Sequence, residues 1–324
     1  MSKTKDVVIA VLGAGISGLR VYTRLRQAGI GAVLIDKSRG LGGRMATRRV
    51  GRFQFDHGAQ FFTARTATFS ALVEDLEANG LCALWQADRY VATPHMSAIG
   101  SSLLGRESNL HLNKMVKGIR REESGWALEV DGAESEIPGN GFFKGVVVAV
   151  PAPQALGIIG TKYSAFEKLK DADYAPCWTL MFAVEMPLKL DDVFVEFPNG
   201  HALRSISFNA SKPGRPALKD LHTYVVHASA NWSQTHLETD KQIVQDMLLR
   251  EVAKTLNLST TPAFVSAHRW RYAEVIRAVD VPCLWDSDID LGACGDWCLG
   301  PRVEMAFESG EAIAARLINK YGRC

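Results

Sequence analysis

The sequence predicts an α/β fold with two lobes, one built on a parallel sheet and the other on a mostly antiparallel sheet with helices over it. Three observations support this prediction. A strand–helix–strand pattern occupies residues 6–36, and a continuous apolar strand at 144–150 returns to the same sheet. From about Tyr174 to Trp270, short β-like runs are separated by Pro, Gly and Asn, as in an antiparallel sheet.

Composition excludes several classes of protein. The 324 residues are 47% hydrophobic and 22% charged, which suits a globular chain with a sizeable core. A net charge of +2 gives no general attraction to nucleic acid or membranes. No apolar run reaches the ~18 residues of a membrane span, and residues 1–6 lack the apolar region of a signal peptide. We expect a cytoplasmic protein that binds neither nucleic acid nor membrane, and the oligomeric state stays open.

The N-terminal pattern has the features of a dinucleotide site. The apolar run 7–12 leads directly into Gly13-Ala14-Gly15-Ile16-Ser17-Gly18. A helix over 19–28 and a strand over 32–35 follow, and Asp36 stands at the end of that strand. G-x-G-x-x-G followed ~20 residues later by an acid is the dinucleotide-binding pattern of a βαβ unit. The alternative is a glycine-rich turn without a ligand.

Each part of this pattern has a physical task. Gly13 allows the tight turn, Gly15 lets the backbone approach a pyrophosphate, and Gly18 lets the helix lie close to the sheet. The helix N-terminus offers unpaired N–H groups and a partial positive charge to phosphates. The carboxylate of Asp36 can accept hydrogen bonds from ribose hydroxyls.

A basic loop follows the second strand. Residues 37–45 contain three glycines and three cations, Lys37, Arg39 and Arg44. Beside a dinucleotide, the glycines allow close approach and the cations offset phosphate charge. The alternative is a solvated basic loop.

The rest of the chain divides between the two lobes. After the short strand and aromatic stretch of 52–63, the spacing predicts helices over 68–79 and 96–104 and strands over 110–119 and 126–130, the second closed by Asp131-Gly132. For the second lobe the spacing predicts strands over 178–184, 193–197, 203–208 and 223–228 and a helix over 241–256. The segment 163–170 is assigned to this lobe too. The expected division is 1–85, 96–155 and 286–324 for the first lobe, and 156–285 with part of 60–100 for the second.

The C-terminus is expected to return to the first lobe. A strand over 289–297 ends in Gly295-Asp296, and Pro301 to Glu304 opens a helix over 305–319 with small residues at 306, 310, 314 and 315. The helix N-terminus after this Gly-Asp is a second anion-binding feature. It suits a flavin, whose pyrimidine edge gains negative charge on reduction. The alternative is a helix that only docks the terminus.

No metal site is predicted. The six cysteines, Cys82, Cys177, Cys283, Cys294, Cys298 and Cys324, include no Cys-x-x-Cys pair, and no histidine and cysteine cluster has metal-ligand spacing. Because cytosolic thiols are normally reduced, we expect free and mostly buried cysteines. A redox pair of Cys294 and Cys298 is the alternative.

Several segments together resemble a known family. The glycine pattern with Asp36, Gly-Gly-Arg at 42–44 and the late Gly295-Asp296 before a terminal helix resemble the two-lobed FAD-dependent amine oxidases and glucose-inhibited-division-like flavoproteins. The similarity to bacterial renalases is closer and covers nearly the whole chain. It also rests on residues 58–65, 96–99, 151–155, 211–215, 227–232, 267–272 and 294–304, and the late block is the most specific.

The resemblance implies a fold and a reaction. The fold is a Rossmann-type FAD-binding lobe with a substrate lobe over a non-covalently bound flavin. The reaction is oxidation of a dihydronicotinamide dinucleotide reduced at the wrong ring carbon, a 2- or 6-dihydro isomer of NAD(P)H. Hydride passes to flavin N5, NAD(P)⁺ leaves, and O2 takes the electrons to give H2O2. Because this transfer needs positioning, we expect no essential catalytic acid or base.

The resemblance also implies site residues. The expected cofactor residues are Gly13, Ala14, Gly15, Ile16, Ser17, Gly18, Asp36, Lys37, Gly43, Arg44, Gly58, Ala59, Gln60, Phe61, Phe62, Thr63, Val116, Gly295, Asp296, Arg302 and Val303. The expected substrate residues are Phe61, Phe62, Thr63, Cys177, Trp178, His227, Trp270 and Tyr272. For the aromatic residues the alternative is a role in core packing. For His57, His227 and His268 the alternative is a structural role through hydrogen bonds.

Two departures from the renalase pattern lie on the substrate side. The segment between Trp85 and Met96 is shorter, and Cys177 stands where threonine is expected. Two other functions therefore stay open. One is a flavin amine oxidase or another FAD-dependent oxidoreductase, and the other is an FAD-binding redox protein without turnover.

Overall fold

The computed structural model describes residues 8–104, 109–131 and 142–322. Residue 7 of the apolar run 7–12, Gly132 and Cys324 lie outside these residues. None of the helices in the described part of the chain is long and apolar enough to cross a lipid bilayer.

A six-stranded sheet organises the first lobe. Its order is β17-β18-β11-β1-β2-β7, and only the edge strand β17 runs antiparallel. The strands are β1 (Val8–Leu12), β2 (Gly31–Ile35), β7 (Leu110–His111), β11 (Gly145–Val148), β17 (Leu284–Asp286) and β18 (Leu291–Ala293). The predicted parallel sheet is confirmed, and β11 lies directly beside β1 as the returning strand.

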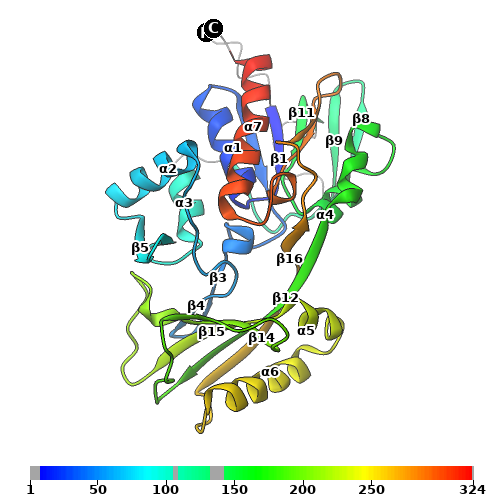
Figure 1. Cartoon of the computed structure of the whole chain (residues 1–324). Coiled ribbons are helices and arrows are strands. Elements are labelled where there is room, and N and C mark those ends of the chain that lie inside the picture. The colour runs from blue at the N-terminus through cyan, green and yellow to red at the C-terminus, as the bar shows by residue number, and fades with distance from the viewer. Residues whose placement is uncertain (1–7, 105–108, 132–141, 323–324) are drawn as a thin grey trace.

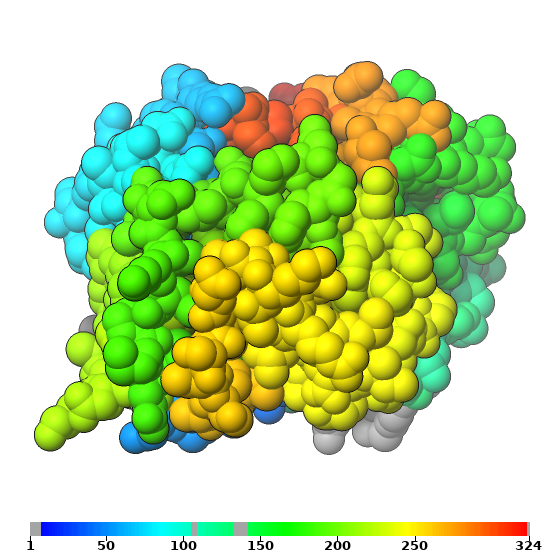
Figure 2. All heavy atoms as spheres, turned by 60° about the horizontal axis from the view of Figure 1, so that its bottom comes forward, coloured from blue at the N-terminus to red at the C-terminus, as the bar shows by residue number. Residues whose placement is uncertain are grey.

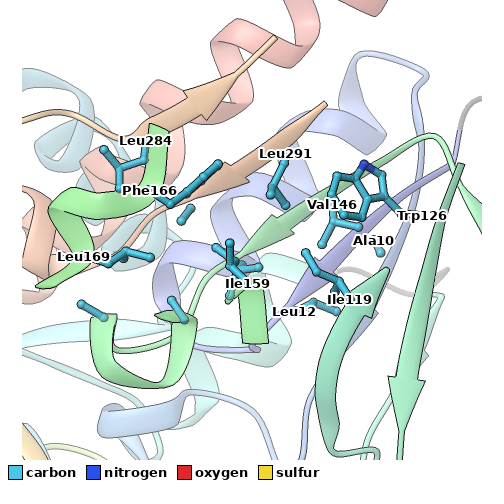
Figure 3. Packing of buried hydrophobic residues seen from close by; sticks show 14 of the residues in the cluster. Ala10, Leu12, Ile119, Trp126, Val146, Ile159, Phe166, Leu169, Leu284 and Leu291 are labelled. Atoms are coloured by element: carbon cyan, nitrogen blue, oxygen red, sulfur yellow. The ribbon is translucent and has the colours of Figure 1, made fainter. Parts of the chain in front are cut away.

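Both faces of this sheet are buried, because its strands are continuous apolar runs. On one face, Ala10, Leu12 and Val146 pack with a hydrophobic cluster that includes Ile159, Phe166 and Trp126 (Figure 3). On the other face, Ile9 and Val11 pack with residues of two helices, among them Leu19 and Ile313.

Those two helices are α1 (Ile16–Gln27) and α7 (Val303–Tyr321), which lie side by side on the sheet (Figure 1). A Cβ on Gly310 would lie 2.4 Å from the carbonyl oxygen of Ser17, so the small residue permits the close approach. The carboxylate of Glu311 pairs with Arg20 at 2.6 Å and Arg24 at 3.0 Å. The expected close packing of the C-terminal helix is confirmed, and its neighbour is α1.

The opposite face carries a small sheet and two short helical segments: β8 (Val116–Glu122), β9 (Gly125–Val130), β10 (Phe142–Phe143), α4 (Ala152–Ile159) and the 3-10 segment Ser164–Asp171. Two predictions are corrected here. The expected strand 110–119 is divided between β7 and β8, with Asn113 at a positive φ of 56° between them. The segment 163–170 packs against the first lobe, because Phe166 and Leu169 share the cluster of the six-stranded sheet.

Short elements after β2 connect the lobes. They are the 3-10 turn Gly43–Met45, the hairpin β3 (Thr47–Val50) and β4 (Phe53–Asp56), α2 (Ala67–Ala78), the hairpin β5 (Cys82–Gln86) and β6 (Arg89–Ala92), and α3 (Ala98–Leu104). The two predicted helices in this region are confirmed, and the N-cap hydroxyl of Thr66 accepts from the Phe69 N–H at the start of α2.

The second lobe is a five-stranded antiparallel sheet in the order β13-β14-β15-β12-β16. Its strands are β12 (Asp173–Val184), β13 (Phe194–Glu196), β14 (Leu203–Phe208), β15 (His222–Ala228) and β16 (Phe264–Arg277). The long strands β12 and β16 run from the first lobe into the second (Figure 1). The antiparallel lobe is confirmed, but the 14-residue strand β16 is absent from the prediction.

The two faces of this sheet have different surroundings. Helices α5 (Ala230–Thr235) and α6 (Lys241–Leu256) cover the outer face, as the yellow spheres in Figure 2 show. Leu180, Val226 and Ala267 pack in the cluster formed with α6. Because side chains alternate along a strand, the neighbouring Thr179, His227 and His268 point to the inner face. Register places Thr179 between His227 and His268.

Candidate active site

A large cavity lies between the two lobes. Its volume is about 1600 Å³, and its lining includes Leu12, Ile35 and Ala149 at the carboxyl ends of three parallel strands. The second lobe contributes Cys177, His227 and residues of β16. Ligands of open α/β sheets bind outside the carboxyl ends of the strands, and a single small molecule usually occupies ~300–1,000 Å³. The cavity therefore has room for a dinucleotide and a second ligand.

Most of the expected site residues line this cavity. They are Gly13, Gly15, Ile16, Ser17, Asp36, Lys37, Gly43, Arg44, Gly58, Ala59, Gln60, Phe61, Val116, Cys177, His227, Trp270, Tyr272, Gly295, Asp296, Arg302 and Val303. Ala14, Gly18, Phe62, Thr63 and Trp178 do not line it. Residues distant in the sequence are thus brought to one place.

Phe62 and Trp178 belong to the core and not to the cavity wall. Phe62 is 3% exposed and packs among Phe69 and other residues behind the loop. Trp178 is 2% exposed, lies in the cluster formed with α6, and donates from Nε1 to the His236 carbonyl at 2.9 Å. Strand alternation explains the second case, because Cys177 faces the cavity and the next residue must face away.

The three glycines of the first turn differ in their surroundings. Gly13 has φ 109°, and a Cβ there would lie 2.4 Å from the Ala149 carbonyl oxygen. A Cβ on Gly18 would lie 1.9 Å from the Gly13 carbonyl oxygen. A Cβ on Gly15 would meet no atom within 4 Å. Gly13 and Gly18 are therefore required by the fold itself, whereas Gly15 keeps space open in front of the α1 N-terminus.

Asp36 closes this turn. Its Oδ2 accepts from the Ala14 N–H at 2.6 Å, and its Oδ1 accepts from the Ser38 N–H at 2.6 Å. A carboxylate has about four acceptor positions, so ribose hydroxyls can still bind. The acid thus fixes the glycine turn and faces the cavity at the same time.

The N-terminus of α7 faces the same cavity. Pro301, Arg302, Val303 and Ala306 line it, and the N-cap Arg302 makes no side-chain capping hydrogen bond. The first N–H groups of a helix have no partner within the helix, so they can bind a negatively charged group. The preceding strand is shorter than predicted, because only Leu291–Ala293 is extended and Asp296–Cys298 forms a 3-10 turn.

The loop after β4 is held tightly against the basic loop. A Cβ on Gly58 would lie 1.9 Å from the Arg44 carbonyl oxygen, which itself accepts from the Ala59 N–H at 2.8 Å. Gln60 donates from Nε2 to the carbonyl oxygens of Asp56 at 2.6 Å and Gly58 at 2.9 Å. The part of the cavity wall formed by 57–61 is therefore fixed by its own hydrogen bonds.

A buried ionic network supports this loop from behind. Arg215 donates to Asp56 Oδ2 at 2.9 Å from Nε and 2.5 Å from Nη2, and Lys212 donates to Gln60 Oε1 at 3.0 Å. Burial raises the pKa of Asp56, but the Lys212 and Arg215 charges outweigh this and leave the pKa below its usual value. Burial lowers the pKa of Lys212 to about 8 despite the attraction of Asp56. Neither Lys212 nor Arg215 lines the cavity.

Three histidines and a tryptophan form the inner wall. Trp270 donates from Nε1 to the His57 carbonyl at 2.9 Å, and its ring lies 5.1 Å from the His57 ring and 4.4 Å from the His268 ring. Burial lowers the pKa of His57 to about 3 and of His227 and His268 to about 4. All three are neutral at pH 7, and the Trp270 ring is held in one orientation.

Several cations of the cavity wall are absent from the sequence prediction. They are Arg48, Arg49, Lys114, Lys117, Arg204, Arg269 and Arg271. The alternation of charged and aromatic residues over 268–272 was the available signal for β16 and its arginines. Arg204 gave no such signal, because it reaches the cavity only through the pairing of β14 with β15.

The five cysteines in the described part of the chain are free, and only Cys177 is not fully buried. This confirms the expectation of free thiols and leaves Cys294 and Cys298 unlinked. Burial raises the pKa of Cys177 to about 12, so this cavity-lining thiol is protonated. Among the described residues, no group of His, Cys, Asp or Glu is arranged to hold a metal ion.

Comparison with known families decides the class of the protein. A family model described as flavin containing amine oxidoreductase matches residues 95–318, and a model described as NAD(P)-binding Rossmann-like domain matches residues 11–76. The chain belongs to the flavin-containing amine oxidoreductase family. The family model covers the second lobe and the cavity-lining residues of 295–306, and it makes the protein a flavin-dependent oxidoreductase that acts on a small molecule.

Solved structures share this fold. A protein from Exiguobacterium sp. 255-15 that bears the name protoporphyrinogen oxidase matches with a TM-score of 0.76 and 11% identity, over 99% of this chain and 100% of that chain. Putrescine oxidase bound to putrescine matches with a TM-score of 0.65 and 13% identity, over 97% and 99%. An oxidoreductase from Methanosarcina mazei gives 0.63 and 12%, over 95% and 100%. At these identities the similarity shows the fold alone.

Proposed function

We propose that the protein is an oxidase with non-covalently bound FAD that takes a hydride from a 2- or 6-dihydro isomer of NAD(P)H. The products are NAD(P)⁺ and, after the electrons pass to O2, H2O2. Bound FAD supplies the hydride acceptor. The proposal rests on the renalase-like sequence segments, and the observation that favours it within the family is the charge of the cavity.

The cavity is strongly basic. Eleven lysine and arginine side chains line it against four carboxylates. The basic residues are Lys37, Arg39, Arg44, Arg48, Arg49, Lys114, Lys117, Arg204, Arg269, Arg271 and Arg302, and the acidic ones are Asp36, Glu196, Glu274 and Asp296. Such a cavity attracts phosphates and repels cationic amines. A dinucleotide substrate suits this charge better than a protonated amine.

The residues around the first turn suit FAD. The α1 N-terminus and the open space at Gly15 would receive its pyrophosphate, and Asp36 would bind a ribose. The α7 N-terminus would stabilise the negative charge that the flavin gains on reduction. Non-covalent binding is supported by Cys177, the described cysteine that lines the cavity, because its thiol is protonated.

The substrate wall is built to orient a ring and not to exchange protons. Trp270 is fixed by its hydrogen bond to the His57 carbonyl and offers a rigid face for stacking a nicotinamide. Because their pKa values are lowered to about 3 to 4, His57, His227 and His268 carry no imidazolium proton near pH 7 and are weak bases. Hydride transfer requires the donor carbon ~3–3.5 Å from its acceptor, so orientation is the main task of the wall.

Anaerobic mixing tests the proposal. The FAD-loaded protein is mixed with 2-dihydro-NAD, 6-dihydro-NAD, ordinary NADH and a set of amines that includes putrescine, and loss of flavin absorbance is followed. We expect rapid bleaching by a dihydro-NAD isomer and slow or no bleaching by NADH and the amines. Rapid bleaching only by amines would establish an amine oxidase instead. Bleaching by dithionite alone would establish a redox protein without turnover.

A further inference from the structure

Arg48 lies on β3 and faces the interior of the cavity. Its register partner on β4 is Phe55, and cross-strand partners share one face of a hairpin. Phe55 is fully buried against Met181 and Val225 on the inner face of the antiparallel sheet. The hairpin therefore directs Arg48 toward the inner wall that carries His57 and His268.

The Arg48 side chain has no counter-charge among the described residues. Its Nε is buried without a hydrogen-bond partner, and no described carboxylate lies within 4.0 Å of its guanidinium. Three other arginines of the cavity wall, in contrast, form ion pairs with carboxylates. Arg204 pairs with Glu274, and Arg269 and Arg271 both pair with Glu238.

The groups nearest to Arg48 are neutral. Its positive charge is among the causes that lower the pKa of His57 and His268, so both imidazoles lie within its electrostatic reach and stay uncharged. His57 is 6% exposed, and its Nδ1 is a second buried atom without a hydrogen-bond partner. Two unsatisfied polar side chains thus line the same part of the cavity.

We propose that Arg48 binds a phosphate group of the substrate and so fixes the nicotinamide end of the molecule against the inner wall. This inference rests on the proposed function, because it names the group through which that substrate is held. A partly buried cation without a partner is unfavourable, whereas a guanidinium and a phosphate form two parallel charge-assisted hydrogen bonds. Arg48 acts in binding and specificity, and the hydride transfer itself does not pass through it.

A ligand series isolates the contribution of the phosphate. Arg48→Gln and Arg48→Lys are compared with wild type and with Arg52→Gln, which removes the same charge from an exposed residue outside the cavity lining. The reductants are the 6-dihydro forms of the dinucleotide, the mononucleotide and the phosphate-free riboside. Flavin reduction is measured anaerobically at fixed ionic strength, because salt screens charge.

We expect Arg48→Gln to weaken binding of the dinucleotide and mononucleotide by about 10- to 100-fold. Binding of the riboside and the maximal rate of flavin reduction should stay within about 2-fold, and Arg48→Lys should recover part of the affinity. An equal loss for the riboside would show a structural role and overturn the inference. So would an Arg48→Gln variant that behaves like Arg52→Gln with every ligand.

A second measurement separates this inference from the proposed function. Inorganic pyrophosphate is titrated into the oxidised, FAD-loaded protein by calorimetry, so that turnover is not needed. We expect wild type and Arg52→Gln to bind and Arg48→Gln to bind at least about 10-fold more weakly. Equal binding by all three overturns the role of Arg48 even if dihydro-NAD reduces the flavin. Failure of every dihydro-NAD isomer to reduce the wild-type flavin overturns the proposed function but leaves the titration decisive for Arg48.

Discussion

Arg44 and Asp296, 252 residues apart in the sequence, form a bidentate ion pair in the wall of the cavity. Nη1 lies 2.6 Å from Oδ2 and Nη2 lies 2.6 Å from Oδ1. Arg44 belongs to the basic loop after β2, and Asp296 precedes α7. The Gly42 N–H of the basic loop donates to the Ala14 carbonyl at 2.9 Å, so the pair links the turn before α1, through this loop, to the segment before α7.

Breaking this pair should destabilise the protein and its cofactor site. Asp296→Asn removes the charge from a carboxylate whose side chain is 7% exposed and leaves Arg44 without a counter-charge. We expect a loss of ~2–3 kcal/mol in the free energy of unfolding and a lower FAD occupancy. Urea unfolding and flavin absorbance measure the two effects.

The matched control is Asp173→Asn, whose exposed carboxylate pairs with Arg277 at 2.7 Å outside the cavity lining. It should cost less than ~1 kcal/mol and leave FAD occupancy unchanged. Similar behaviour of the two variants would mean that the Arg44–Asp296 pair has no special role.

Two alanine substitutions in the first turn should have different effects. Gly18→Ala places a Cβ 1.9 Å from the Gly13 carbonyl oxygen, so the protein should unfold at a lower temperature or fail to fold. Gly15→Ala meets no protein atom within 4 Å, so its Tm without cofactor should match wild type. Its FAD affinity should nevertheless fall by 10-fold or more, because the methyl group takes the place of the pyrophosphate. Normal FAD affinity of folded Gly15→Ala would contradict the placement of the pyrophosphate.

Asp36→Ala should weaken FAD retention. The substitution removes the acceptor for the Ala14 and Ser38 N–H groups and the acceptor for ribose hydroxyls. We expect an increase of about 10-fold or more in the FAD dissociation constant. Cys294→Ser serves as the control, because a serine can still accept from the Ser17 hydroxyl, and it should retain FAD. Unchanged occupancy of Asp36→Ala in a reconstitution assay would remove the ribose role.

Stability should fall at acid pH because of the wall histidines. The pKa of His227 is about 4 in the folded protein and ~6.5 in the unfolded chain, so the unfolded state takes up the proton first as pH falls. The stabilisation is present above pH ~6.5 and is lost between ~6.5 and 4. Its slope is at most ~1.4 kcal/mol per pH unit. Tm should decrease across this window, and His227→Gln should show a shallower decrease. Parallel curves for the two proteins would rule out this linkage.

Local pattern was sufficient to predict much of the fold. Asp36 and the glycine turn identify the first βαβ unit, and the helix over 241–256 coincides with α6. Strand register and long-range packing were not predictable from local spacing. Trp178 illustrates the first, because its neighbour Cys177 points into the cavity whereas Trp178 points into the core. Phe166 illustrates the second, because an amphipathic turn does not reveal which sheet it covers.

The cavity was predictable on its cofactor side and less so on its substrate side. The residues at 13–18, 36 and 295–303 carry sequence patterns with a physical meaning of their own. Cross-strand pairing places Arg48 opposite Phe55, and no short pattern marks Arg48. The alternation over 268–272 indicates a strand, but only the pairing with Thr179 shows which way His268 points. The substrate wall is therefore a property of the tertiary structure.

The flavin content of the purified protein tests the central claim most directly. The protein is expressed, its absorbance spectrum is recorded, and the flavin released by denaturation is identified and quantified against protein concentration. We predict a yellow protein that carries one FAD per chain and releases it completely without proteolysis. A colourless protein that takes up no added FAD would contradict the assignment of the cavity.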